Sequence, residues 1–137
     1  MRRESGFTLL EAIVALAILA AGTMALFAAL NGALRSLERA EAAARLDTAT
    51  ENAVDFLEAL NPMLRPQGEA ELGEYTLRWR AEPLLGPTDN LTDYLQPGLY
   101  EVALYAIDGE LLLDGEVAGR FTLRRAGWRQ VRRPELS

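Results

Sequence analysis

The chain opens with Arg2-Arg3-Glu4-Ser5-Gly6-Phe7-Thr8-Leu9-Leu10-Glu11, and the segment that follows, Ala12 to Leu34, carries no charged side chain. Those 23 uncharged residues exceed the roughly 20 that an apolar helix needs to cross a bilayer. Alanine and leucine dominate the segment, and both favour a helix locally. Under the positive-inside rule the paired arginines stay in the cytoplasm, so the C-terminal part of the chain is expected on the outer side of the membrane.

Glu11 is the unusual residue of this apolar segment, because a carboxylate inside lipid costs about 3 kcal/mol on insertion scales. A secretory signal has an apolar core of only about 7–15 residues with a small-residue cleavage site after it, and this run is longer. A plain signal anchor explains the hydrophobicity and leaves Glu11 without a purpose. Glu11 is therefore either a stray carboxylate near the interface or a group whose cationic partner comes from another chain.

Residues 2–11 resemble the class III leader of type IV prepilins and of type II secretion pseudopilins. The resemblance implies that a membrane peptidase cuts between Gly6 and Phe7 and then N-methylates the new amino terminus on Phe7. The glutamate of that family falls on Glu11, which is expected to pair with the α-amine of Phe7 in a neighbouring subunit and to set the register of assembly. Each group is costly in lipid alone, and the two become acceptable as an ion pair.

Beyond the membrane segment, residues 35–61 keep a helical pattern although charged residues now accompany the apolar ones. Asn61-Pro62 is expected to end the helix. An apolar stripe recurs at spacings of three and four, formed by Leu46, Ala49, Ala53, Phe56, Leu57 and Leu60. This stripe can dock on a sheet of the same chain or pack against neighbours in an assembly. The first interpretation is favoured for the stripe, and subunit contact is favoured for residues 7–34.

Residues 62–137 are expected to form a small antiparallel β head. Residues 74–82 alternate apolar and polar side chains, which is the pattern of a half-buried strand. Residues 83–98 are rich in turn residues and are expected to form a loop. The remaining expected elements are strands at 99–107, 111–113 and 117–125, a hairpin turn at Asp108-Gly109 and a further turn at Asp114-Gly115. A long helix, half in the membrane and half periplasmic, packed on this sheet gives an α+β, pilin-like fold.

The chain contains neither cysteine nor histidine, so it lacks disulfides, the usual general base and the commonest metal ligand. No catalytic constellation is present, and we expect no enzymatic activity, no cofactor and no metal site. Asp89 and Asp93 flank a loop at which some major pseudopilins bind calcium, but two carboxylates are too few for such a site. Asn90-Leu91-Thr92 fits a glycosylation sequon, a pattern of low specificity.

Charge is distributed unevenly along the chain. From Arg35 to Gly119 there are seventeen acidic residues and six arginines, whereas from Arg120 to the end there are six arginines and one glutamate. The acidic body argues against nucleic-acid binding. The arginine-rich terminus can pair with acidic neighbours in an assembly or form a solvated tail, and the sequence favours neither interpretation. Trp79 and Trp128 are expected to pack in the core and at an edge.

The expected parts are a prepilin leader at residues 1–6, a transmembrane assembly helix at 7–34, a periplasmic helix at 35–61 and a β head with a basic tail at 62–137. The chain is expected in the bacterial inner membrane as a single-pass protein with a cytoplasmic N-terminus and a periplasmic C-terminal domain. From there it would be incorporated into a pseudopilus or pilus.

Two shorter stretches, Gly73–Pro83 and Glu51-Asn52-Ala53, are similar to the I-class minor pseudopilins. The expected function is that of a minor pseudopilin, a non-catalytic subunit that helps to initiate or cap the periplasmic pseudopilus of type II secretion. Expected partners are other minor and major pseudopilins or pilins, the prepilin peptidase, the inner-membrane assembly platform and membrane lipid. The alternatives are a V-type minor pilin that primes a type IV pilus and a membrane-anchored periplasmic binding module that never polymerises.

Overall fold

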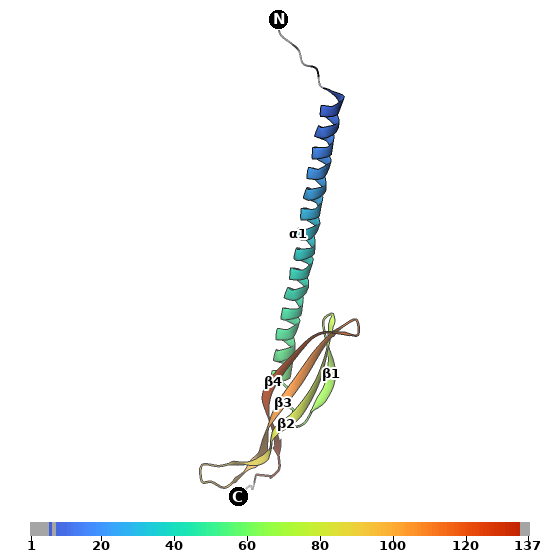
Figure 1. The fold of residues 1–137 in the computed structure, drawn as a ribbon. Helices are drawn as coiled ribbons and strands as arrows, with labels where there is room; N and C mark the ends of the chain where they lie inside the picture. Colours follow the sequence, from blue (N-terminus) through green and yellow to red (C-terminus); the bar gives the residue numbers. More distant parts are fainter. Residues whose placement is uncertain (1–5, 7, 135–137) are drawn as a thin grey trace. The chain divides into compact units, whose positions relative to one another are not determined.

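The computed structural model describes residues 6 and 8–134. One helix is followed by four strands: α1 Leu9–Glu58, β1 Gln67–Leu72, β2 Tyr75–Leu91, β3 Pro97–Leu113 and β4 Glu116–Gln130. The chain forms two compact units whose boundary lies between Ala43 and Ala44, inside α1. The first unit is helical and the second contains the sheet (Figure 1).

In the first unit, α1 runs from Leu9 to Ala43 and continues without a break through Gly22 and Gly32. Its hydroxyl side chains bond back to the helix itself: Thr23 Oγ1 donates to the carbonyl of Leu19 at 2.8 Å. Such bonds satisfy polar side chains locally, so that the hydroxyl needs no partner from lipid or from another helix.

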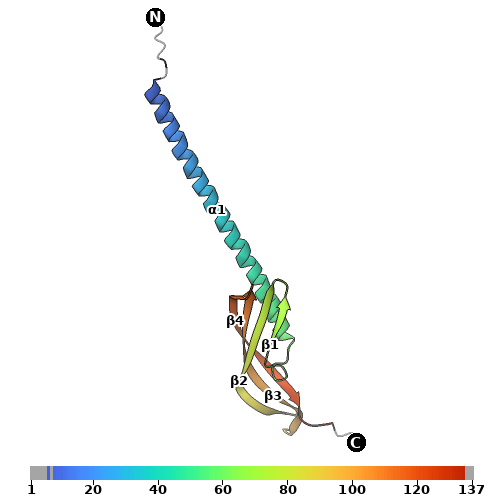
Figure 2. The ribbon, with the colours of Figure 1, turned by 90° about the vertical axis from the view of Figure 1, so that its right-hand side faces the viewer.

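The second unit is an antiparallel sheet with the strand order β1-β2-β3-β4, in which every strand pairs with its neighbour in the sequence. The last turns of α1 lie against one face of this sheet (Figure 2). Ala49, Ala53 and Leu57 from α1 are buried there together with alternate residues of β2 and β3. The predicted docking of the apolar stripe on the chain's own sheet is confirmed, as is the α+β, pilin-like fold.

Trp79 is the largest buried side chain of the head, with only 2% of its surface exposed. The ring of Phe56 from α1 lies 5.5 Å away, centroid to centroid, and the indole Nε1 donates to the carbonyl of Arg65 at 3.3 Å. A Cβ at residue 68 would collide with the indole, so Gly68 of β1 allows the backbone to approach the ring closely. Trp128 is half-exposed on the edge strand β4, as predicted.

The predicted hairpin at Asp108-Gly109 is wrong. Gly109 lies in the middle of β3, opposite Trp79 of β2 and Phe121 of β4, and a Cβ at this position would enter the Phe121 ring. The glycine therefore serves close packing and makes no turn. The turn lies at Asp114-Gly115, where φ is 51° and 82°, the left-handed pair that a two-residue hairpin requires.

The predicted loop at residues 83–98 is mostly strand, and β1 was not predicted. Strand β1 begins opposite Arg80, and Ala81 N–H still donates to Pro66 O just before it. Among the described residues β2 has no neighbouring strand on that side from Glu82 onward, and it can accommodate prolines there. Register shifts in the pairing of β2 with β3 absorb the irregular part around Pro87. The turn residues thus shape an edge strand, and only residues 92–96 connect β2 to β3.

The helix ends at Glu58, slightly before the predicted stop at Asn61-Pro62. The guanidinium of Arg125 in β4 donates to the carbonyl of Glu58, which caps the helix with a cation at its negative end. The side chain of Asn61 then binds the backbone of Trp128: its Nδ2 donates to the carbonyl at 2.6 Å, and its Oδ1 accepts from the N–H at 3.2 Å. These contacts attach the end of α1 to β4.

Candidate functional site

The side chain of Thr8 caps the start of α1. Its Oγ1 accepts a hydrogen bond from the backbone N–H of Glu11 at 3.2 Å. Thr8-Leu9-Leu10-Glu11 also has the spacing of a capping box, with a threonine N-cap and a glutamate three residues later. Gly6 lies two residues before this cap, whereas Phe7 lies outside the described residues. The structure therefore describes one side of the predicted cleavage site.

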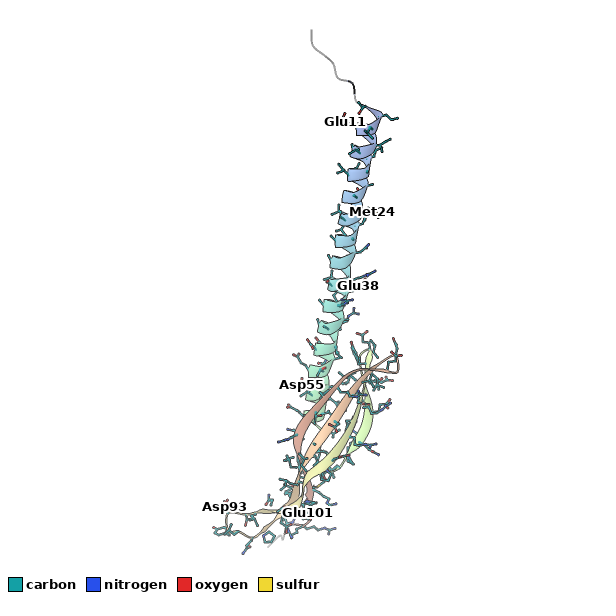
Figure 3. All side chains as sticks on the ribbon, viewed as in Figure 1. Glu11, Met24, Glu38, Asp55, Asp93 and Glu101 are labelled. Atoms are coloured by element: carbon teal, nitrogen blue, oxygen red, sulfur yellow. The ribbon has the colours of Figure 1, made fainter. Side chains whose placement is uncertain are left out.

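Glu11 lies exposed in the first turn of α1 (Figure 3). A carboxylate at this position favours the helix, because the N-terminal end of a helix carries a partial positive charge. Arg35 is the next basic residue along α1, about 36 Å away at 1.5 Å per residue. Within residues 6 and 8–134 no cation lies within ion-pair distance of Glu11.

The apolar part of α1 presents large hydrophobic side chains all round. Between Leu9 and Leu37 they are at least half exposed, and the most exposed are Leu9, Leu10, Met24 and Ile18. The helix is long and apolar enough to cross a membrane, judged by its length and composition. A helix that is hydrophobic on every face requires lipid or other helices around it. The exposed apolar side chains of the first unit therefore need lipid or other helices to cover them.

Residues 1–27 match the family model of the prokaryotic N-terminal methylation motif. The chain carries a prepilin-type signal. The methylation motif indicates a type IV pilin-like protein, either a pilin or a pseudopilin, and such proteins are structural subunits. It implies processing by a prepilin peptidase and association with other pilins, and with the apolar helix it is consistent with a membrane-anchored protein. No curated protein and no solved structure matched the chain.

The methylation motif ends within the apolar segment and does not include the head. Of the two loop carboxylates, Asp89 is bound by Arg132 through two hydrogen bonds of 3.0 Å, and Arg132 also donates to the carbonyl of Gly98 at 2.7 Å. These hydrogen bonds hold the pKa of Asp89 below its ordinary value. Among the described residues no cluster of three acidic side chains could hold a metal ion.

The arginine-rich terminus is mainly a strand, and three of its arginines pair with acids of the same head. Arg120 contacts Glu110 at 2.9 Å, Arg129 contacts Glu101 at 2.7 Å, and Arg132 contacts Asp89. Neither interpretation drawn from the sequence described this arrangement. Two of these pairs form because the register of β3 with β4 places Arg120 opposite Glu110 and Arg129 opposite Glu101.

The sheet face opposite the core carries a row of alternating charges across all four strands. Glu69, Arg78, Glu110 and Arg120 stand side by side in the registers of β1 to β4. Their contacts measure 3.5 Å, 4.0 Å and 2.9 Å in that order. We call this row the charge ladder. Opposite charges on neighbouring strands stabilise a sheet modestly, and here they leave a glutamate at one edge and an arginine at the other.

Sequence reasoning missed two groups that matter for these sites. The cap at Thr8 was readable from the Thr-x-x-Glu pattern at the helix start. The binding of Asn61 to Trp128 had no sequence signal, because the two residues lie 67 positions apart and meet only through the packing of β4 beside the end of α1.

Proposed function

We propose that this chain is a minor pseudopilin, a non-catalytic subunit that helps to initiate or cap the periplasmic pseudopilus of type II secretion. The observation that supports it is the methylation motif over residues 1–27, which extends into a helix whose apolar side chains are exposed on all faces. The core of the head consists of residues of the second unit, and in this proposal the exposed apolar side chains of residues 9–37 pack against other subunits.

In this proposal the peptidase cuts between Gly6 and Phe7, and Phe7 is N-methylated. The new α-amine is a cation at the edge of the apolar segment, and Glu11 is the carboxylate that it meets on a neighbouring subunit. Thr8 engages the backbone N–H of Glu11 and leaves the side chain available. Because each isolated charge is costly in lipid, the pair forms only when a subunit docks in the correct axial position.

The proposed location is the bacterial inner membrane, with the leader in the cytoplasm and the head in the periplasm. Arg2 and Arg3 precede the apolar segment, and this placement follows the positive-inside rule. Partners are other pseudopilins, the prepilin peptidase and the inner-membrane assembly platform. The second candidate is a V-type minor pilin that primes a type IV pilus, because the methylation motif is common to pilins and pseudopilins.

Mass spectrometry of the N-terminus of the full chain, purified from membranes, tests the proposal. The expected mature protein begins with N-methylated Phe7. A chain that still begins at Met1 in cells with an active prepilin peptidase would overturn the proposal and favour a membrane-anchored module that does not polymerise.

Co-purification distinguishes the two machines. Detergent-solubilised full chain is captured in cells that express either minor pseudopilins or minor pilins, and the bound subunits are identified. Retention of the pseudopilins supports the proposed function, whereas selective retention of pilus subunits supports the second candidate.

A further inference from the structure

The two edges of the head sheet differ in charge. On β1 the residues whose side chains lie on the charge-ladder face are Gln67, Glu69 and Glu71, and on β4 they are Arg120, Thr122, Arg124 and Ala126. All of them are exposed. Among the described residues, neither Glu71 nor Arg124 forms an ion pair. One edge therefore offers carboxylates and the other offers guanidinium groups.

The same residues carry the unpaired backbone groups of these edges. In an antiparallel ladder the N–H and C=O of successive residues point alternately toward the partner strand and away from it. Val131 N–H donates to Leu99 O at 2.9 Å, and Ala81 N–H donates to Pro66 O at 2.6 Å. The registers are regular from these bonds into both strands. The backbone groups of odd-numbered residues of β4 and of even-numbered residues of β1 therefore point into the sheet. Those of Arg120 and Arg124 on β4 and of Glu69 and Glu71 on β1 point outward.

The open part of the β4 edge is bounded on both sides. At Trp128 the outward N–H and C=O are already bound by Asn61. Toward the start of the strand, the register shifts between the pairs Leu111–Gly119 and Leu112–Val117. This irregularity disrupts the β4 edge there. The interval between these points, residues 120–126, is long enough for the six residues of β1.

We propose that the β4 edge of one head pairs with the β1 edge of a second copy of this chain, so that the two sheets become continuous. In the proposed register Thr122 lies opposite Glu69 of the second copy, Arg120 opposite Glu71 and Arg124 opposite Gln67. Each arginine then has a glutamate opposite or diagonally adjacent, within the range of cross-strand pairs. The charge ladder then continues from Arg120 of one head to Glu69 of the next through a diagonal contact, and the sign of the charge still alternates.

Strand direction and face both agree with neighbours that have the same orientation. A second head shifted sideways presents β1 antiparallel to β4, because adjacent strands alternate in direction across the sheet. On both edges the outward backbone groups belong to residues of the charge-ladder face, so that the joined sheets keep this face on one side. Residues 44–58 of both copies then lie on the other side and run in the same direction, as membrane-anchored neighbours require.

The charges also select this pairing over the symmetric ones. An antiparallel β4–β4 pair would bring Arg120 and Arg124 of two copies together, and a β1–β1 pair would do the same for glutamates; like charges on opposing strands destabilise a pair. Charged side chains on an edge strand commonly prevent pairing with other chains. Here they disfavour pairing of an edge with the identical edge of a second copy and allow pairing with the opposite edge. The contact is heterologous and can repeat along an assembly.

Cysteine cross-linking in membranes tests this contact, since the chain has no cysteine of its own. Two differently tagged full-length copies are co-expressed, one with Thr122→Cys and the other with Glu69→Cys, and oxidised. Opposed residues at such positions have Cα atoms about 5.5 Å apart, within the disulfide range of about 4.4–6.8 Å. Each copy carries a single cysteine, so that every disulfide is intermolecular.

The matched control pairs Thr122→Cys with Thr76→Cys, which lies on the same face in the interior of the sheet. We expect several-fold more disulfide-linked dimer for the Glu69 pair than for the Thr76 pair. Equal yields, or a dominant cross-link between two Thr122→Cys copies, would overturn the proposal.

A charge exchange provides the second measurement. Arg120→Glu in the Thr122→Cys copy should abolish the cross-link, and Glu71→Arg in the Glu69→Cys copy should restore it. If Arg120→Glu prevents folding, Arg124→Ser is used instead and should lower the yield several-fold, whereas Arg80→Ser in the sheet interior should leave it unchanged. A yield that ignores these changes would contradict the contact. The contact involves head residues only, so its failure leaves the N-terminal processing result intact.

Discussion

Glu11 serves the helix with its backbone and, in our proposal, the assembly with its side chain. Its N–H is taken by Thr8 Oγ1, and its carboxylate has no cation among the described residues. A negative charge in the first turn stabilises a helix even without an ion-pair partner, because the N-terminal end of the helix carries a partial positive charge. This benefit is small compared with the cost of about 3 kcal/mol in lipid, so that a partner is still required once the segment is fully inserted.

Replacing Glu11 with Ala should leave membrane insertion and cleavage intact and abolish incorporation into filaments, because the cation of the neighbouring subunit then has no carboxylate. Incorporation is measured by fractionating sheared filaments, and cleavage by mass spectrometry. Glu38→Ala, in α1 beyond the apolar segment, is the matched control and should assemble normally. Normal incorporation of Glu11→Ala would refute the assembly role of this residue.

Replacing Thr8 with Ala removes the side-chain cap and should loosen the first turn of α1 by about 1 kcal/mol. Hydrogen exchange of the Glu11 amide, measured on the full chain in detergent micelles, should accelerate roughly fivefold. Thr8→Ser keeps the hydroxyl and should exchange like the wild type. An unchanged exchange rate in Thr8→Ala would show that the cap does not hold this amide.

At the scale of elements, the head depends on how the end of α1 is joined to β4. Arg125 caps the helix at Glu58, and Asn61 supplies Trp128 with a donor and an acceptor at the outer edge of its strand. An edge strand with free backbone groups invites pairing with other chains. Asn61 therefore both fastens β4 and limits the part of its edge that remains open.

Replacing Asn61 with Ala leaves the N–H and C=O of Trp128 without a protein partner. Because this region is partly exposed, water replaces some of what is lost, and the free energy of unfolding should fall by about 1–2 kcal/mol. Denaturant unfolding followed by tryptophan fluorescence measures it. Asn52→Ala changes an exposed asparagine of α1 and should have little effect. A variant as stable as the wild type would mean that the amide contributes no net stability.

At the scale of the head as a whole, contacts within the fold pair four of its arginines with four of its acids. Three arginines of β4 and of the segment after it pair with acids of β2 and β3. The Arg132–Asp89 pair fastens the segment after β4 to the loop end of the β2–β3 hairpin. Each exposed ion pair of this kind contributes little to the stability of the head. The strand register decides which arginines and acids pair, and therefore which surface charges remain unpaired.

The Arg132–Asp89 pair predicts that acid weakens the attachment of the segment after β4 to the loop end of the β2–β3 hairpin. Hydrogen bonds from Arg132 lower the pKa of Asp89 in the folded head, so the unfolded chain takes up this proton first as the pH falls. The contribution is complete above the ordinary aspartate pKa of about 3.9 and disappears as the pH drops through the lower folded value.

Unfolding of wild type and Asp89→Asn from pH 7 to pH 2 measures this contribution. The wild type should be the more stable above about pH 5, and the difference should vanish toward pH 2 as Asp89 is protonated. Asp93→Asn, in the connection between β2 and β3 of the same hairpin, is the control and should follow the wild type throughout. A stability difference that stays constant down to pH 2 would contradict the pairing.

The sequence by itself determined the features that depend on nearest neighbours along the chain. The leader, the charge-free segment to Leu34, the apolar stripe of the helix and the alternation of residues 74–82 are all local patterns. They predict elements directly, because helix and strand periodicities are properties of a few consecutive residues. From these patterns the α+β fold and the candidate processing site could be named.

The tertiary structure decided what depends on residues far apart in the chain. Gly109 lies within β3 because the Phe121 ring occupies the space of its Cβ, and β1 forms because β2 offers it an edge over a core that contains Trp79. The arginines after Gly119 obtain their partners only from the register of β3 with β4. Long-range pairing fixes these choices, and no periodicity encodes it. The charge-free segment from Ala12 to Leu34 predicts the helix from the sequence alone. The two oppositely charged sheet edges depend on which strands pair, and only the tertiary structure defines them.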